Sequence, residues 1–405
     1  MPTDRARALI AGIRPIRDTE LIHVKNAAGR VLAAAVKARA DVPHFDRAVM
    51  DGYAVRAADT FGASESQPVY LRVVGSVEMG KTVRRPIHQG EAMRISTGGM
   101  LPPGADAVVM IEYTEELGDA TAEVRRGVAP WENVQRVGED VRRGCLLFDK
   151  GWRLRSFDLG GLTGTGVTHV RVFRKPRVAL ISTGDEIVPP DAKPKPGQVR
   201  NINEYALVPV LEDAGAAVTD YGVIRDDAEL FSRSLAKALE SHDAVMLSGG
   251  SSVGTKDITL ASIASLPGAS VAFHGISIAP GKPTILAFAM KKPILGIPGH
   301  PMSALVIGLL YAAPLVRVLG GERPERVFQP KSRVRAILSE PIASAPGRED
   351  YVRVKLEETN GLRRAVPMPG KSASVFNLIH ADGLVAVPAY AEGLEAGTEV
   401  EVLLL

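Results

Sequence analysis

The chain contains 405 residues, of which 45% are hydrophobic and 23% charged, a composition that excludes a disordered protein and predicts roughly two to four globular domains. Its 49 basic and 46 acidic residues leave a net charge of +3 that is spread over the whole length. The densest basic patches, Arg84-Arg85 and Arg142-Arg143, are short, so we expect no nucleic-acid-binding surface.

The cysteine content and the apolar runs of the sequence indicate in which cellular compartment the protein is located. Cys145 is the only cysteine, which excludes an internal disulfide and a thiolate metal cluster. Residues 1–16 contain no apolar signal core, and the longest apolar run, residues 304–316, is too short to span a bilayer. We therefore expect a cytoplasmic protein that does not enter the membrane.

The first half of the chain mixes short helices with β-rich sequence. A helix is predicted from Thr3, as its N-cap, to Ile13, and a second, alanine-rich helix ends near Ala40. Between Phe45 and Asp140, short β-branched runs alternate with Gly- and Pro-rich turns, which predicts a β-rich insert. More strand-like, Gly-rich sequence follows over residues 141–172, and residues 174–176 read as a linker.

The second half gives the clearest fold prediction. The apolar run 178–181 is typical of a strand buried on both faces, and strands then alternate with helices up to the helix 302–319. This alternation predicts an α/β domain with a parallel sheet. Beyond Pro324 only strand patterns remain, which predicts a small C-terminal β domain.

Two loops follow buried strands of the α/β domain and are suited to an anion. They are residues 182–186 (Ser-Thr-Gly-Asp-Glu) and residues 248–254 (Ser-Gly-Gly-Ser-Ser-Val-Gly). Ligands of such sheets bind beyond the carboxyl ends of the strands, and glycines let backbone N–H groups face a phosphate. The alternative is that each loop is only a tight strand-to-helix turn, but two such loops in one domain favour a binding site.

Carboxylates lie next to these loops in the sequence. Glu186, Asp226 and Asp257 are the candidate ligands for Mg²⁺, which prefers oxygen donors and usually takes only one or two carboxylates directly. Asp257 has a structural alternative, as a charge at the start of a helix. Asp227 is better explained as a helix N-cap.

A third group of candidates consists of rigid turns and acidic turns. Lys282 lies between prolines in residues 280–283, which positions an ammonium group for an anion, and residues 298–301 form a similar turn into a helix. In the β-rich insert, Asp51, the turn containing Thr97, and Asp140 are further candidates. Each of these is also explained by an ordinary solvated turn.

Taken together, these segments resemble the molybdopterin molybdenumtransferase family, the bacterial MoeA type that is related to the gephyrin E domain. The resemblance rests on motifs that occur in the family's order over nearly the whole chain: residues 50–54, 95–98, 102–106, 138–140, 182–186, 225–227, 248–257, 280–283, 298–303 and 370–372. One Gly-rich loop would be unspecific, but this ordered series is highly specific.

The resemblance implies four domains and a homodimer. Domain I would comprise residues 1–45 and 141–175, domain II the β-rich residues 46–140, domain III the α/β residues 176–326, similar to molybdopterin adenylyltransferases of the MogA and MoaB type, and domain IV a β-barrel of residues 327–405. The active site would lie between domain III of one chain and domain II of the other. Such an enzyme takes adenylylated molybdopterin and molybdate with Mg²⁺ and releases AMP.

The resemblance also implies roles for residues. Catalytic roles fall on Asp51, Thr97, Asp140, Glu186, Asp226, Asp257 and Lys282, of which Glu186, Asp226 and Asp257 would hold metal. Ligand-binding roles fall on Ser182, Thr183, Gly184, Ser248, Gly249, Gly250, Ser251, Ser252, Gly254, Pro280, Gly281, Pro298, Gly299, Pro301 and Ser372. Molybdopterin adenylyltransferase and apo-molybdoenzymes are the expected protein partners.

The chain departs from the family's pattern where many members carry two lysines, because it has Gly275 and Ala279 there. It also has His300 where asparagine is common. Losing two cations should weaken attraction for molybdate unless His274, Lys256 or His300 compensates. The alternatives are therefore a slower paralogue or a non-catalytic scaffold of the same fold. An adenylyl-transferring enzyme is a further alternative, because the α/β domain alone resembles the molybdopterin adenylyltransferases, and a preference for tungsten also stays open.

Overall fold

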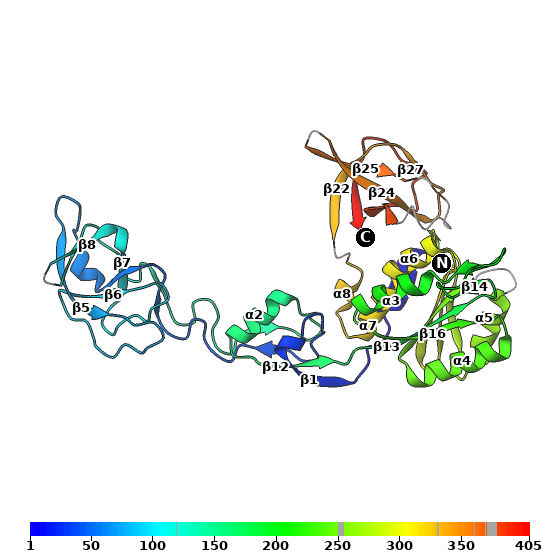
Figure 1. Cartoon of the computed structure of the whole chain (residues 1–405), viewed down its shortest axis with the longest axis horizontal. Coiled ribbons are helices and arrows are strands. Elements are labelled where there is room, and N and C mark those ends of the chain that lie inside the picture. Colours follow the sequence, from blue (N-terminus) through cyan, green and yellow to red (C-terminus); the bar gives the residue numbers. More distant parts are fainter. Residues whose placement is uncertain (119, 250–254, 330–331, 360, 369, 371–378) are drawn as a thin grey trace.

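The structure is a computed structural model that describes residues 1–118, 120–249, 255–329, 332–359, 361–368, 370 and 379–405, with residues 255–257 and 359 described by their backbone alone. The chain is elongated (Figure 1). A β-rich body lies at one end, a narrow arm follows, and the α/β body and a C-terminal barrel lie at the other end.

The α/β body is a six-stranded sheet between two helical layers. The strand order is β16-β13-β17-β21-β20-β18. Its strands are β13 (Arg177–Thr183), β16 (Ala217–Ile224), β17 (Ala244–Gly249), β18 (Ser270–His274), β20 (Ile285–Ala289) and β21 (Lys292–Ile297). Its helices are α3 (Asn203–Asp213), α4 (Ala228–Ser241), α5 (Thr255–Ala264), α6 (Pro301–Ile307) and α7 (Ala313–Leu319), with short α8 (Pro324–Val327) and the strand pair β14 (Ile187–Val188) and β15 (Val199–Arg200).

The predicted parallel sheet is confirmed for four strands and needs one correction. The strands β16, β13, β17 and β21 are parallel, whereas β20 pairs antiparallel with both β21 and β18. A two-residue turn joins β20 to β21, and so short a connection cannot cross over to make a parallel pair.

Alternating residues of β13 divide the core between the two faces of the sheet. Val178 and Leu180 pack against α1 (Thr3–Ala11), α3, α6 and α7, while Ala179 and Ile181 pack against α4 and α5. The sheet is therefore buried on both sides, as the apolar run predicted. Within α4, Leu230 is 41% exposed, whereas the neighbouring Phe231 is buried in the core.

The long apolar helix is continuous over Pro301–Leu319, because a π-helical segment (Gly308–Ala312) joins α6 to α7. By length and composition it could cross a membrane, so the expectation that this stretch is too short was wrong. It is nevertheless 72% buried inside the protein, which is the position of a core helix.

The C-terminal domain is a closed barrel, as predicted. The strands β24 (Glu349–Thr359), β25 (Leu362–Pro367), β22 (Arg333–Leu338), β28 (Glu399–Leu404) and β26 (Gly383–Val387) pair in that order, and β26 pairs back onto β24. Two shorter strands, β23 (Ile342–Ala343) and β27 (Gly393–Leu394), pair with each other. The strand β19 (Ile278–Ala279) belongs to the α/β body but pairs with β24, so the two bodies share hydrogen bonds.

The distal body is β-rich, as predicted. Its sheet has the order β7-β4-β6-β5-β9-β8 and an apolar core on each face. The strands are β4 (Gly52–Val55), β5 (Val69–Ser76), β6 (Glu91–Ile95), β7 (Ala107–Met110), β8 (Thr114–Leu117) and β9 (Thr121–Val124). Outside the sheet, β3 (Arg47–Ala48) pairs with β10 (Val134–Gln135), and two short 3-10 helices (Ala57–Thr60 and Ile111–Tyr113) complete the body.

The arm corrects two predictions. It consists of β1 (Thr19–His23) paired with β12 (His169–Phe173), β2 (Val36–Lys37) paired with β11 (Leu146–Phe148), a 3-10 turn (Val24–Asn26) and α2 (Ser156–Gly164). The predicted alanine-rich helix ending near Ala40 is absent from this described segment. There, the amides of Leu32 and Ala38 donate to Trp152 and Cys145 across the arm, so tertiary pairing overrides helix propensity.

The helix α2 replaces part of the strand-like sequence expected over residues 141–172. The carboxylate of Asp158 accepts from the backbone N–H of Arg155 and from Trp152 Nε1, which fixes the first turn despite three glycines.

Thr3 is also not an N-cap, because α1 begins at Thr3 itself, and its hydroxyl donates to Glu349 of the barrel. The helix α1 packs on the α/β core through Ala6 and Ile10.

Candidate functional site

Three loops meet at the carboxyl edge of the α/β sheet. In the sheet register, Ser182 of β13 is paired with Ser248 of β17, and Ser248 with Ile297 of β21. The loops that follow these strands therefore start side by side. This confirms that the first predicted loop and the start of the second share one edge.

Side chains of this edge are buried and tied to one another. Ser182 and Ser248 are 1% and 2% exposed. Nδ2 of Asn203, at the start of α3, donates to Ser248 Oγ at 3.0 Å and to the carbonyl of Gly299 at 2.8 Å. Ser182 Oγ has no hydrogen-bond partner within the described part of the chain. A buried hydroxyl without a partner is a donor left for a ligand.

The glycines of these loops allow a close approach of backbones. Gly249 has φ of +110°, and a Cβ there would stand 2.2 Å from the carbonyl oxygen of Thr183. A Cβ on Gly299 would lie 3.4 Å from the Cα of Gly249. The end of β17 and the loop after β21 are therefore packed against each other, and larger residues would separate them. Pro298 is buried and Pro301 begins α6, with His300 exposed between them.

Carboxylates gather beside the first loop. The backbone N–H of Asp226 donates to Asp185 Oδ1 at 3.2 Å, and the carboxyl of Glu186 folds back over Gly184. Burial raises the pKa of Asp226 above its ordinary value, and the negative charges of Asp185 and Glu186 raise it further. The cluster thus concentrates negative charge that a cation would relieve.

A complete protein cage for a metal is absent from the described residues, among which no three His, Cys, Asp or Glu side chains converge as ligands. The carboxylates of Glu186 and Asp226 nevertheless lie close enough to interact. Mg²⁺ usually takes only one or two carboxylates directly, together with phosphate oxygens and water. The donors present therefore fit Mg²⁺ held jointly with a phosphate-bearing ligand. Asp227 caps α4 through Leu230 N, as predicted.

The lysine turn lies next to the barrel. The backbone N–H of Ile276 donates to the carbonyl of Lys282 at 2.9 Å, and Thr284 Oγ1 donates to the carbonyl of Gly281 at 2.7 Å. A Cβ on Gly281 would stand 2.6 Å from Cδ1 of Ile307 in α6. The backbone of the turn is therefore fixed, while the Lys282 side chain is exposed.

Asp51 and Thr97 lie together in the distal body. The backbone N–H of Thr97 donates to Asp51 Oδ1 at 2.6 Å, and this bond, with one from the Thr97 hydroxyl, lowers the pKa of Asp51. Asp140 lies exposed near the arm, where its N–H donates to the carbonyl of Val42. The distal body and the α/β body lie at opposite ends of the chain (Figure 1), so these residues do not meet the sheet edge within one chain.

Several predicted residues fall outside the described residues: Gly250, Ser251, Ser252, Gly254, Ser372 and the side chain of Asp257. Their placement stays a prediction.

Arg353 of β24 is a candidate that sequence reasoning missed. Its side chain is 5% exposed, Nη2 donates to the carbonyl of Gly370 at 2.8 Å, and Nη1 has no partner among the described residues. Burial lowers its pKa. A buried guanidinium without a carboxylate is costly unless an anion binds it. The alternating sequence around Arg353 resembled a solvent-facing strand position and gave no signal.

Comparison with known proteins covers nearly the whole chain. Residues 1–166 match the family described as MoeA N-terminal region (domain I and II), residues 179–318 a probable molybdopterin binding domain, and residues 335–405 the MoeA C-terminal region (domain IV). The chain is similar to the molybdopterin molybdenumtransferase of Bacillus subtilis, at 32% identity over 100% of this chain and 94% of that one. It is also similar to that of Nostoc sp., at 33% identity over 96% and 89%.

A solved structure supports the same relationship. The molybdopterin biosynthesis moeA protein from Pyrococcus horikoshii OT3 is 31% identical, covers 100% of both chains and superposes with a TM-score of 0.85. The arrangement of four bodies is therefore that of a solved relative over its full length.

Proposed function

The chain belongs to the MoeA family, and on that premise we propose that it is a molybdopterin molybdenumtransferase that uses adenylylated molybdopterin, molybdate and Mg²⁺ and releases AMP. Its place is in molybdenum cofactor biosynthesis. The observation that carries the proposal is the loop edge of the α/β sheet. There, the buried Ser182 hydroxyl, which has no partner among the described residues, lies together with converging glycine loops and clustered carboxylates.

The edge has separate groups for the anionic and the cationic parts of such a reaction. Ser182 Oγ and the loop amides are donors for phosphate oxygens, and Lys282 on its fixed turn adds positive charge. Asn203 positions Ser248 and the Gly299 loop relative to each other. Arg353 Nη1, which has no partner among the described residues, is a further donor that we assign to an oxyanion on the barrel side.

Glu186 and Asp226 are the residues that would hold Mg²⁺, with Asp185 adding negative charge. When bound, the cation would neutralise charge that develops on the departing phosphate. Burial and then the charges of Asp185 and Glu186 raise the pKa of Asp226, and a divalent cation would oppose that rise.

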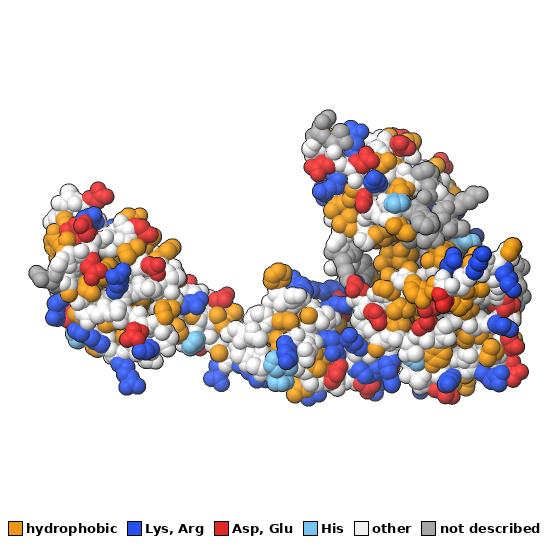
Figure 2. All heavy atoms as spheres, in the orientation of Figure 1, with side chains coloured by type: hydrophobic (Ala, Val, Ile, Leu, Met, Phe, Trp, Pro, Cys, Tyr) orange, Lys and Arg blue, Asp and Glu red, His pale blue; other side chains and the backbone are white. Residues whose placement is uncertain are grey.

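A homodimer would complete the site. Asp51 and Thr97 are held in a defined geometry, yet they lie at the far end of the chain from the loop edge. Exposed apolar side chains support a second copy. They lie over α2 in Figure 2, where Phe157 is 90% exposed, and beside the loop edge, where Tyr205 of α3 is exposed. We place the enzyme in the cytoplasm.

The activity is tested with pure protein, adenylylated molybdopterin, Mg²⁺ and molybdate, with tungstate in a parallel reaction. We expect AMP release together with reconstitution of an apo-molybdoenzyme. Binding of the ligand without turnover would instead identify a scaffold, and consumption of ATP would identify an adenylyl-transferring enzyme.

The shared site is tested by mixing two inactive variants, Asp51→Asn and Asp226→Asn. In a mixed dimer one site carries both substitutions and the other carries neither. Random exchange of chains should therefore restore about a quarter of the wild-type rate. If each chain contains its own complete site, the mixture stays inactive, and the two-chain site is wrong.

A further inference from the structure

A groove lies at the opposite edge of the α/β sheet from the loops, at the amino ends of its parallel strands. It has a volume of about 460 Å³ and is lined by the segment after α1, the β20–β21 turn and the end of α7. Its floor is apolar, from Ile13, Phe288 and Leu319. A ligand there would leave the loop edge open.

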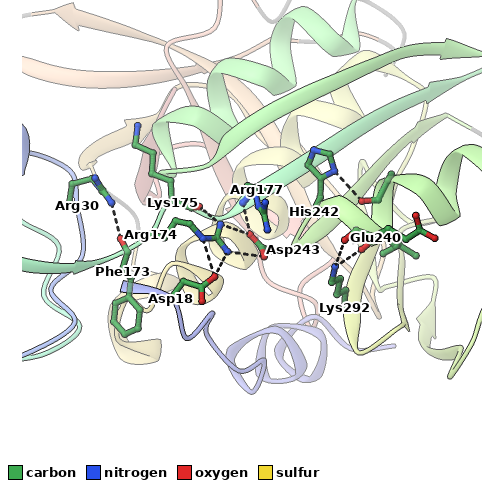
Figure 3. Close-up of polar contacts among 12 residues, drawn as sticks. Asp18, Arg30, Phe173, Arg174, Lys175, Arg177, Glu240, His242, Asp243 and Lys292 are labelled. Carbon is green, nitrogen blue, oxygen red and sulfur yellow. Dashed lines mark hydrogen bonds and ion pairs between the residues drawn. The ribbon is translucent and has the colours of Figure 1, made fainter. Parts of the chain in front are cut away.

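The rim of this groove carries three exposed cations. Arg14, Arg17 and Lys291 are exposed, and none of the three forms an ion pair with another described residue. The remaining lysine in the lining, Lys292, is already engaged, because its ammonium donates to the carbonyls of Leu239 and Glu240 at the end of α4 (Figure 3).

The acidic residue of the lining does not balance these charges. Asp243 accepts from Arg174 Nη1 at 2.9 Å and from the backbone N–H of Arg177 at 2.7 Å (Figure 3). Arg174 also binds Asp18, so it joins the arm to the α/β body. The charge of Asp243 is therefore already paired with Arg174, and the groove keeps an excess of positive charge over an apolar floor.

The turn that presents Lys291 is strained. Met290 and Lys291 have φ of +50° and +63°, and Ala289 pairs with Lys292, so they form a two-residue hairpin turn. Asn and Gly are the usual residues at both positions, since other residues cost about 1 kcal/mol each in the left-handed region. The fold thus holds a lysine at the groove at an energetic cost, as is common at binding sites.

The residues and helix ends around the groove favour carboxylates over phosphate as its ligand. Phosphate sites are built from glycine-rich loops and helix N-termini, whereas α1, α4 and α7 turn their C-terminal ends toward this edge. The negative ends of these helices disfavour a concentrated dianion. Single carboxylates spaced along a chain can instead pair with Arg14 and Arg17, while an apolar side chain between them covers the floor.

We propose that this groove binds an acidic peptide segment of a partner protein, in which carboxylates flank an apolar side chain, and so holds the partner on the edge opposite the loop site. The inference is independent of the proposed function, because it concerns different residues. Docking at this edge would keep a partner in place while the loop site remains accessible.

The test measures binding of a short fluorescein-labelled peptide, with glutamates on both sides of a central leucine, by fluorescence anisotropy at low and physiological salt. Arg14→Glu combined with Arg17→Glu should weaken binding about ten-fold or more, with thermal unfolding unchanged. The matched control is Arg84→Glu with Lys237→Glu, which makes the same change of net charge at exposed positions elsewhere. The control should change binding little.

A second variant separates binding from folding. Lys291→Gly relieves the left-handed backbone, so it should raise the unfolding temperature while it weakens peptide binding. The proposal is overturned if the wild type fails to bind the peptide at low salt or if the control weakens binding equally. It is also overturned if inorganic pyrophosphate competes as strongly as unlabelled peptide, because the groove would then be a phosphate site.

Discussion

Arg7 and Glu349 join the first helix to the C-terminal barrel through an ion pair of 2.7 Å, although 342 positions separate them in the sequence. Thr3 Oγ1 donates to the same carboxylate at 2.7 Å, and Tyr351 accepts from Arg7. The barrel strand β24 also pairs with β19, directly before the lysine turn. The position of the barrel is therefore coupled to the turn that carries Lys282.

Arg7→Ala should destabilise the protein by roughly 2–3 kcal/mol, because it leaves the half-buried carboxylate of Glu349 without its cationic partner. Burial opposes ionisation of Glu349, but bonds from Thr3 and Arg7 outweigh it, so the pKa of Glu349 is lowered. Its contribution to stability is present above the unfolded pKa and is lost as pH falls through the lowered value. Chemical unfolding at several pH values measures both effects.

The matched control for this variant is Asp4→Asn, which removes only the exposed partner of Arg7. It should leave the stability nearly unchanged. Equal losses from the two variants would contradict the assigned role of Glu349.

Gly249→Ala should destabilise the α/β body by more than about 3 kcal/mol, since the added Cβ would meet the Thr183 carbonyl oxygen at 2.2 Å. Gly268→Ala is the control. Gly268 has φ of +67° and open space around it, so only the backbone cost of about 1 kcal/mol applies. Denaturant unfolding of both variants separates the clash from the backbone conformation, and similar losses would exclude a close approach at Gly249.

The raised pKa of Glu204 predicts that the stability of the protein depends on pH. Burial raises its pKa to about 7, and the hydrogen bond and charge of Asp220 add to this rise. The unfolded value is about 4.3, so the folded state binds more protons between these values. The free energy of unfolding should therefore fall as pH rises from about 4.3 to 7.

Glu204→Gln should remove this dependence. Glu212→Gln, at an exposed position of the same helix, should keep it. If the free energy of unfolding varied with pH in the same way for the wild type and Glu204→Gln, Glu204 and Asp220 would not share a proton.

Two aspartates of the distal body form similar bonds but should differ in function. Asp51 accepts from Thr97 N, and Asp106 accepts from Ala57 N, both at 2.6 Å. Asp51→Asn should lower turnover by about 100-fold at nearly unchanged stability. Asp106→Asn should lower stability and leave turnover of the folded protein unchanged. The reverse pattern would remove Asp51 from the site.

Ala279→Lys should tighten molybdate binding roughly three- to ten-fold at low salt, because it adds a cation beside the Lys282 turn. Ala279 is half-buried in β19 and has an extended conformation, whereas Gly275 has φ of +90° and would strain a lysine. Titration calorimetry against Ala279→Gln, which has similar length and no charge, isolates the charge. Equal affinities for both variants would contradict the charge-loss argument.

The sequence determined the local features of this protein. Apolar periodicity predicted the α/β alternation and the barrel strands, and Gly-rich segments after apolar runs predicted the loop edge, because these properties depend on neighbouring residues. The Asp227 cap was equally predictable, since its bond spans three residues.

Only the tertiary structure decided what depends on distant partners. The alanine-rich segment forms no helix because its backbone N–H groups donate to carbonyls between residues 145 and 171, and Thr3 binds the barrel instead of capping a helix. The buried position of Arg353 and the distance of Asp51 from the loop edge also come from packing between bodies. Such contacts join residues hundreds of positions apart, and the free energy of each depends on burial that no local pattern contains.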